Sequence, residues 1–140
     1  MAEFLEELMN LPSVYQARRS PDAQLAALNI ANLHSNFDIF VTNPQDPTTI
    51  TPLTNTNELT IFHQWFPDSK SVLVSQDTAR NERTTCYRVF LNEPNKLHPL
   101  TQENPDFFLR TPCLSPDGRN LYFFANYDFD EKKVVYSNAW

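Results

Sequence analysis

The side chains that most often carry catalysis or bind metals are few in this sequence and lie far apart. The three histidines are His34, His63 and His98, and none forms the H-x-x-H or H-E-x-x-H spacing that places two imidazoles on one metal ion. Cys86 and Cys113 are the two cysteines, and they form no C-x-x-C pair. We therefore expect no metal ion and no cofactor, and we interpret the cysteines as reduced residues of a cytoplasmic protein.

Gly118 is the single glycine of the 140 residues. The Rossmann motif, the Walker motif and the G-x-S-x-G nucleophile elbow each need several glycines for tight turns and close backbone approach, so the sequence excludes all three. No other motif indicates a serine, histidine and acid triad. We predict that this chain alone is not an enzyme.

The charge balance and hydropathy argue against two classes of partner, nucleic acids and membranes. Eleven basic and 17 acidic residues give a net charge of −6, and the basic cluster Arg18-Arg19 has only two residues. Proteins that bind nucleic acids neutralise phosphates with clustered Lys and Arg, so we expect no nucleic-acid partner. No apolar run approaches the ~18 residues of a membrane span, and the acidic N-terminus does not resemble a secretory signal, so we expect no membrane partner.

Two short motifs recur with nearly the same period. Pro-Leu-Thr occurs at residues 52–54 and 99–101, which are 47 positions apart. Three segments that contain a Pro-Asp pair also line up, and their prolines are 46 and 49 positions apart. Proline suits the second position of a β-turn, and aspartate bonds the backbone two residues further on, so we interpret the aspartates as turn formers. The expected turn residues are Pro21, Asp22, Pro67, Asp68, Pro116, Asp117 and Gly118.

Short β-rich runs surround each Pro-Asp turn. The first strand of a unit is clearest at residues 60–66, and the fourth is the short stretch that ends in Pro-Leu-Thr. The expected second strands are residues 25–30, 71–75 and 121–125, and the expected third strands are residues 37–41, 85–90 and 133–136. Four short strands every 40 to 50 residues are typical of β-propeller blades. A β-sandwich is the alternative, but it does not require the same turns at a fixed period.

The fold that we predict is all-β, a partial β-propeller of about three four-stranded antiparallel blades. The blades are expected at residues 13–54, 55–101 and 102–140, the last incomplete, after an N-terminal helix and entry segment at 1–12. The helix is indicated by Phe4, Leu5, Leu8 and Met9, and it either packs across a blade edge or docks on a partner. Closed propellers typically have about four to eight blades. We therefore expect a fragment or truncated form, with a small protein completed by self-association as the alternative. We expect the isolated chain either to be marginally folded or to self-associate through an uncovered blade face.

The third unit supplies a resemblance to a known family. Its Ser-Pro-Asp-Gly-Arg-Asn-Leu-Tyr-Phe run at residues 115–123, with Leu-Thr closing a unit, resembles the propeller repeats of the prolyl oligopeptidase family of serine peptidases. Similar repeats occur in the Tol-system propeller protein. Residues 10–14, with Ser-Pro-Asp a few residues later, look like the entry into a first blade of the peptidases, and residues 75–83 also resemble the peptidase group. The resemblance covers residues 10–140. The chain departs from the family repeat at Ala23 and Ser69, where glycine is preferred, and at Phe66, where serine is preferred.

The resemblance implies a non-catalytic role. In that family the propeller precedes an α/β-hydrolase domain with a Ser-Asp-His triad, caps its active site and filters substrates by size. The expected function is thus a substrate-gating segment whose partner is a peptide or an α/β-hydrolase domain. A stand-alone propeller-type module that binds peptides or proteins is the alternative.

Two charged loops occupy equivalent places between a second and a third strand, at residues 77–83 and 128–133. They are interpreted either as solvated hairpin loops with internal ion pairs or as rim loops that contact a substrate or the hydrolase domain. The candidate contact residues are Asp77, Arg80, Glu82, Arg83, Asp128 and Asp130.

Overall fold

The computed structural model describes residues 7, 10–34 and 36–135, and this part of the chain is all-β. The described residues form twelve strands, and every strand pairing is antiparallel. The helix expected over residues 3–9 lies outside the described residues except for Glu7.

Two four-stranded meanders make up most of the molecule. In each sheet the strands follow one another in chain order, β1-β2-β3-β4 and β5-β6-β7-β8. We call these sheets unit 1 and unit 2. Unit 1 comprises β1 (Ser13–Arg19), β2 (Ala26–Ala31), β3 (Phe37–Asn43) and β4 (Asp46–Pro52). Unit 2 comprises β5 (Thr60–Trp65), β6 (Ser71–Gln76), β7 (Thr85–Phe90) and β8 (Leu97–Pro99).

The third unit differs from the expected sheet. Here β9 (Leu109–Leu114) pairs with β10 (Leu121–Ala125), and a separate hairpin pairs β11 (Tyr127–Asp128) with β12 (Lys133–Val134). The strand expected at residues 133–136 therefore pairs with β11 and not with β10. Asn126 explains the change, because its side-chain oxygen accepts a bond from Phe108 N at 2.7 Å and its carbonyl accepts one from Val135 N at 2.9 Å. We call β9–β12 unit 3.

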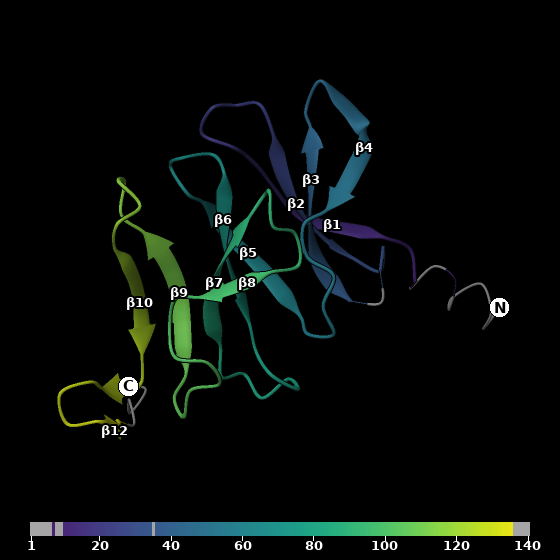
Figure 1. Ribbon diagram of the computed structural model, residues 1–140. Helices are drawn as coiled ribbons and strands as arrows, with labels where there is room; N and C mark the ends of the chain where they lie inside the picture. The colour runs from purple at the N-terminus through teal and green to yellow at the C-terminus, as the bar shows by residue number, and fades with distance from the viewer. Residues whose placement is uncertain (1–6, 8–9, 35, 136–140) are drawn as a thin grey trace.

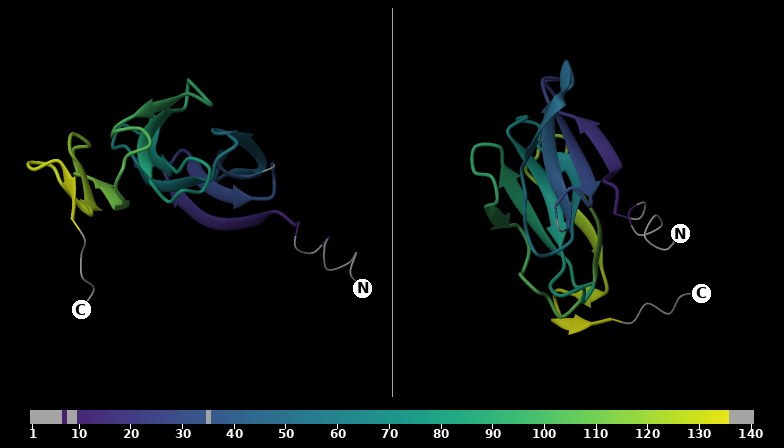
Figure 2. Two further views of the ribbon diagram at one scale, coloured as in Figure 1. Left: turned by 90° about the horizontal axis from the view of Figure 1, so that it is seen from below. Right: turned by 90° about the vertical axis from the view of Figure 1, so that its right-hand side faces the viewer.

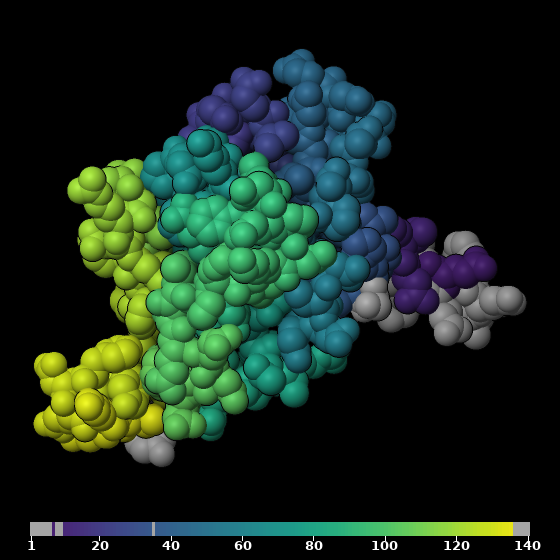
Figure 3. Space-filling view, viewed as in Figure 1, coloured from purple at the N-terminus to yellow at the C-terminus, as the bar shows by residue number. Residues whose placement is uncertain are grey.

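The three units lie side by side in chain order (Figures 1 and 2). Strand β5 contacts both β1 and β9, so the first strands of neighbouring units approach one another. The space-filling view shows unit 3, in yellow-green and yellow, beside the green surface of unit 2 (Figure 3). In Figure 1 the three Pro-Asp turns form a row along the upper edge, and the loop after β6 and the β11–β12 hairpin lie at the lower edge.

The core lies between the units. One cluster joins units 1 and 2, and a second joins units 2 and 3. Strand β6 serves both clusters, because Val72 and Val74 enter the first and Leu73 enters the second. A strand that is buried on both faces reads as a continuous apolar run, which explains the sequence Val-Leu-Val. Full burial of each such side chain contributes roughly 1.5–3 kcal/mol to stability.

The Pro-Leu-Thr motif fastens the end of each four-stranded unit to its third strand. In unit 1, Leu53 N donates to Ile39 O at 2.8 Å, and Ile39 N donates to Thr54 Oγ1 at 2.9 Å. The threonine hydroxyl accepts the bond from a third-strand amide where the fourth strand no longer supplies a backbone acceptor, which explains why the motif recurs. The same pair of bonds in unit 2, at 2.8 and 3.0 Å, joins Leu100, Cys86 and Thr101.

Candidate functional site

The loop between β6 and β7 borders a cleft of about 360 Å³ at the junction of units 2 and 3. Leu59 and Ile61 supply its apolar part. Three of the candidate residues from the sequence, Asp77, Arg80 and Glu82, line its charged part, together with Arg110 from β9. The sequence did not indicate Arg110, because β9 follows the loop by more than 20 residues and only the packing of unit 3 brings it there.

Side-chain carboxylates hold the backbone of this loop, one from the loop itself and one from the segment before β5. Asp77 Oδ2 accepts a bond from Glu82 N at 3.0 Å, and Ala79 N donates to Glu58 Oε2 at 3.0 Å. Ala79, Arg80 and Glu82 have φ angles of 52°, 57° and 61°. Such angles are uncommon outside glycine and cost energy, so the side-chain bonds hold a conformation that the backbone alone disfavours.

The ion pairs of this loop run to β9 and to the segment just before β9, and not within the loop, which corrects the expectation of internal pairs here. Arg83 Nη1 lies 3.3 Å from Asp106 Oδ1, and Arg110 Nη2 lies 3.6 Å from Glu82 Oε2. These pairs are exposed, and each contributes about 0–1 kcal/mol. They position the loop against unit 3 more than they stabilise the fold.

Asp128 and Asp130 lie in the β11–β12 hairpin, away from the cleft. The Oδ1 atom of Asp128 accepts bonds from Asp130 N at 3.0 Å and Glu131 N at 2.9 Å, and Lys133 forms an ion pair with Glu131. The hairpin shares the lower edge with the loop after β6 (Figure 1). The structure thus places the two charged loops on one edge, but only the first contributes to the cleft.

The three Pro-Asp segments form β-turns with the same backbone geometry. The residue after each aspartate is left-handed, with φ angles of 62° at Ala23, 57° at Ser69 and 70° at Gly118. Its amide donates to the carbonyl three residues earlier, at 2.9 to 3.0 Å in all three turns. This geometry favours glycine, and two of the turns adopt it with a side chain present.

Neighbouring turns also contact one another. Ser69 Oγ accepts a bond from Asp22 N at 3.0 Å, so the side chain of the second turn holds the first. At Gly118, an added Cβ atom would lie 2.7 Å from Pro67 Cδ. The φ angle therefore favours glycine at this position, and the close approach of the second turn leaves no room for a Cβ atom.

The turn aspartates are bonded as acceptors. The Ser20 and Ser115 hydroxyls donate to Asp22 and Asp117 at 2.6 Å, and these bonds, followed by backbone bonds, lower the pKa of both carboxyl groups. A carboxylate of lowered pKa is a poor proton carrier near pH 7. These groups are suited to holding turns.

Sequence reasoning missed a hydrogen-bonded serine and histidine pair. His63 Nε2 lies 2.6 Å from Ser75 Oγ, because the β-bulge at His63 turns this residue out of the regular register of β5. Burial lowers the pKa of His63 to about 4, so the ring is neutral near pH 7. Ser75 is 3% exposed, which leaves its hydroxyl no room to attack a substrate. The pair therefore joins two strands, and only the bulge could have indicated it.

Asp38 is a second polar group that the sequence did not single out. It is fully buried, and its Oδ1 atom accepts bonds from Thr54 Oγ1 at 2.8 Å and from Thr56 N at 3.3 Å. Burial raises the pKa of this carboxyl group in spite of these bonds. The carboxyl group fixes the segment that leads from unit 1 into unit 2.

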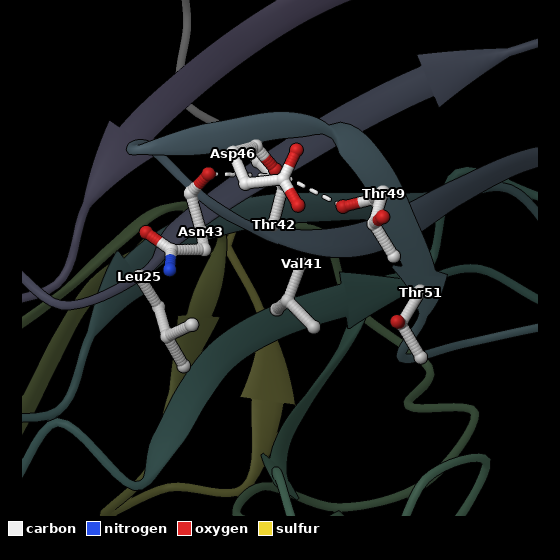
Figure 4. A pocket seen from close by; sticks show the side chains of 7 residues that line it. All are labelled: Leu25, Val41, Thr42, Asn43, Asp46, Thr49 and Thr51. Atoms are coloured by element: carbon white, nitrogen blue, oxygen red, sulfur yellow. Dashed lines mark hydrogen bonds between the residues drawn. The ribbon is translucent and has the colours of Figure 1, made fainter.

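Figure 4 shows a further hollow, of about 310 Å³, between the turn into β2 and the β3–β4 hairpin. Its polar groups are threonine hydroxyls, Asn43 and Asp46, and Thr42 Oγ1 donates to Thr49 O at 2.7 Å. A single carboxylate among hydroxyls forms no acid and base pair. This hollow does not offer a catalytic arrangement.

Comparison with known protein families gives no match, and neither does comparison with curated proteins. In residues 7, 10–34 and 36–135, no three His, Cys, Asp or Glu side chains are grouped as a metal site requires. Nor does this part of the chain contain a helix that is long and apolar enough to cross a membrane.

Proposed function

We propose that the chain is a non-catalytic β-propeller segment, similar to the substrate-gating part of prolyl oligopeptidase-type serine peptidases. Two meanders with the same strand order, joined face to face through apolar cores, support this proposal. The row of equivalent turns between neighbouring units supports it further.

The observation that carries the proposal is the exposure of one repeated position. Ala27 in unit 1 is 1% exposed and Leu73 in unit 2 is 0% exposed, because the following unit covers each of them. Tyr122, the equivalent residue of β10, is 57% exposed, and Phe124 on the same strand is 74% exposed. Large exposed aromatic side chains on one face are typical of a surface that packs against something else. A further blade would cover this face as unit 2 covers unit 1.

Hydrogen exchange tests this proposal on the whole chain. If this segment lacks further units, unit 2 should be the most protected, because only that unit is covered on both faces. Amides of β6 should then exchange more slowly than those of the equivalent strands β2 and β10 by roughly tenfold or more. A stand-alone module would protect all three units alike. Uniform protection would therefore reject the proposal.

The gating role assigns the lower edge to an α/β-hydrolase domain. The charged cleft at the junction of units 2 and 3 supports this role, because its side chains pair across units and leave Arg80 without an acidic partner among the described residues. We expect binding to the purified hydrolase domain of a prolyl oligopeptidase-type peptidase, measured by calorimetry. Arg80→Ala should weaken it, and Lys70→Ala, at the opposite edge, should not. Equal binding by both variants would remove the cleft from this role.

A stand-alone interaction module is the second candidate. The same cleft favours it, since apolar Leu59 and Ile61 lie beside charged groups, as in many ligand sites. This candidate requires that the isolated chain binds peptides as a stable monomer.

A further inference from the structure

A second groove, of about 290 Å³, lies between units 1 and 2 near the row of turns. The end of β1 forms one wall through Arg18 and Arg19, and the bulged part of β5 forms the other through His63 and Gln64. Trp65 spans the two walls, because its Nε1 atom donates to Arg18 O at 2.9 Å. Both walls belong to described units, so the groove exists whether or not a propeller is completed.

The two arginines of this groove have unused hydrogen-bonding capacity. Arg18 Nη1 donates to Ala17 O at 3.2 Å, and Arg19 Nη2 donates to Ala23 O at 3.1 Å. A guanidinium has five N–H donors, and both side chains are exposed. No acidic side chain of the described residues pairs with either arginine. Both arginines line the groove, so it presents guanidinium groups without an acidic partner to an anion, in a chain of net charge −6.

The opposite wall contributes no charge. His63 is neutral near pH 7 because burial lowers its pKa to about 4, and its Nε2 atom is bonded to Ser75. Gln64 is uncharged, and its Oε1 atom accepts a bond from Leu114 N of unit 3 at 3.0 Å. The groove thus offers the guanidinium donors of its β1 wall, and no carboxylate among its lining residues competes for them.

We propose that this groove binds a carboxylate group of a peptide, held by Arg18 and Arg19. The planar fork of a guanidinium matches a carboxylate with two parallel bonds. The groove volume suits one side chain or one chain end, since whole ligand pockets start at about 300 Å³. An extended polyanion is disfavoured by the negative charge of the remaining surface. The carboxylate comes from a peptide C-terminus or from an Asp or Glu side chain.

The test uses the fluorescence of Trp65 in the full chain. The protein has two tryptophans, so Trp140→Phe leaves Trp65 as the only reporter. Three capped alanine pentapeptides are titrated: one with a free C-terminus, one amidated with a central glutamate, and one amidated without any carboxylate. We expect a saturable change with at least one of the first two and none with the third. The active peptide identifies the source of the carboxylate.

Substitutions on the same background assign the binding to the two arginines. Arg18→Gln with Arg19→Gln should weaken binding about tenfold or more, because it removes the charge-assisted hydrogen bonds to the carboxylate. Lys70→Gln removes one exposed cation from the neighbouring turn and should leave binding unchanged. The Arg18→Lys, Arg19→Lys variant keeps the charge, and we expect it to bind the peptide less tightly than the parent. It provides the same test if the glutamine variant does not fold.

Three results would overturn the proposal. They are equal binding of the peptide without a carboxylate, unchanged binding in both double variants, and a response to inorganic phosphate with none to either carboxylate peptide.

Discussion

Arg88 Nη2 lies 2.6 Å from Asp68 Oδ2. This contact takes the place of a hydrogen bond that the other two turns have, in which the serine two positions before the aspartate donates to its carboxylate. In units 1 and 3 a serine hydroxyl donates to the turn aspartate, but unit 2 has Phe66 at the serine position. The guanidinium of Arg88 lies over the Phe66 ring, with Cζ 3.9 Å from its centroid, and reaches the aspartate from there. A change that removes one donor is thus compensated by a residue 20 positions from Asp68.

Removing this contact should destabilise the protein. We expect Arg88→Ala to lower the free energy of unfolding by about 1–2 kcal/mol, because it removes a partly buried ion pair and a ring contact. Arg83→Ala, which breaks the exposed pair with Asp106, should change it by less than about 0.5 kcal/mol. Urea titration measures both. Equal losses would show that Arg88 does not support the second turn.

The glycine of the third turn should be the least replaceable of the three turn positions. We expect Gly118→Ala to cost about 2 kcal/mol or more, because the left-handed φ angle and the approach of Pro67 both oppose a Cβ atom. Ala23→Gly relieves the same φ angle and should stabilise the protein by up to about 1 kcal/mol. If thermal melts of the two variants do not differ in this direction, the close contact between the third turn and Pro67 of the second turn is wrong.

Stability should fall as the pH drops from about 6.5 to about 4. Burial lowers the pKa of His63 from 6.5 to about 4 in the folded state, so the unfolded state takes up a proton at higher pH than the folded state does. The folded state therefore loses up to about 3 kcal/mol across this range and is most stable above it. His63→Gln should flatten the pH dependence of urea unfolding here. A variant with the parent's slope would exclude His63 as its cause.

Asn29 should be essential to the joint between units 1 and 2. Its side chain is buried, accepts a bond from Phe62 N at 2.9 Å and donates to Asp38 O and Thr60 O. Asn29→Leu leaves these groups without partners and should cost about 3 kcal/mol or prevent folding. Asn92→Ala, on an exposed turn, should cost less than about 0.5 kcal/mol. A mild effect at Asn29 would mean that the apolar cluster alone holds the joint.

The sequence predicted the strands well where an apolar run and its flanking turns lie within one unit. The third strand expected at residues 85–90 coincides with β7 (Thr85–Phe90), and the second strand expected at 71–75 ends one residue before β6 (Ser71–Gln76). The apolar run and its flanking turns lie close together in the chain, so proline, aspartate and side-chain pattern suffice to indicate them. The all-β class follows from the same signals.

Contacts between units could not be predicted, because they join residues about 30 to 50 positions apart. Asn29 reaches Phe62, and Gln64 reaches Leu114, through backbone groups that have no sequence signature. The pairing of β12 with β11 depends on one asparagine, Asn126, which diverts the chain. The cleft residue Arg110 and the pair of His63 with Ser75 were missed for the same reason.

The association state of the chain tests the central claim most directly. We predict that light scattering detects dimers or larger species, and that Tyr122→Ser with Phe124→Ser gives a monomer with an unchanged far-ultraviolet spectrum, because these rings form the uncovered face. Leu100→Ser, an exposed apolar residue elsewhere, should leave the association unchanged. A parent chain that is monomeric and unfolds in one sharp transition would contradict the claim that this exposed face packs against another unit.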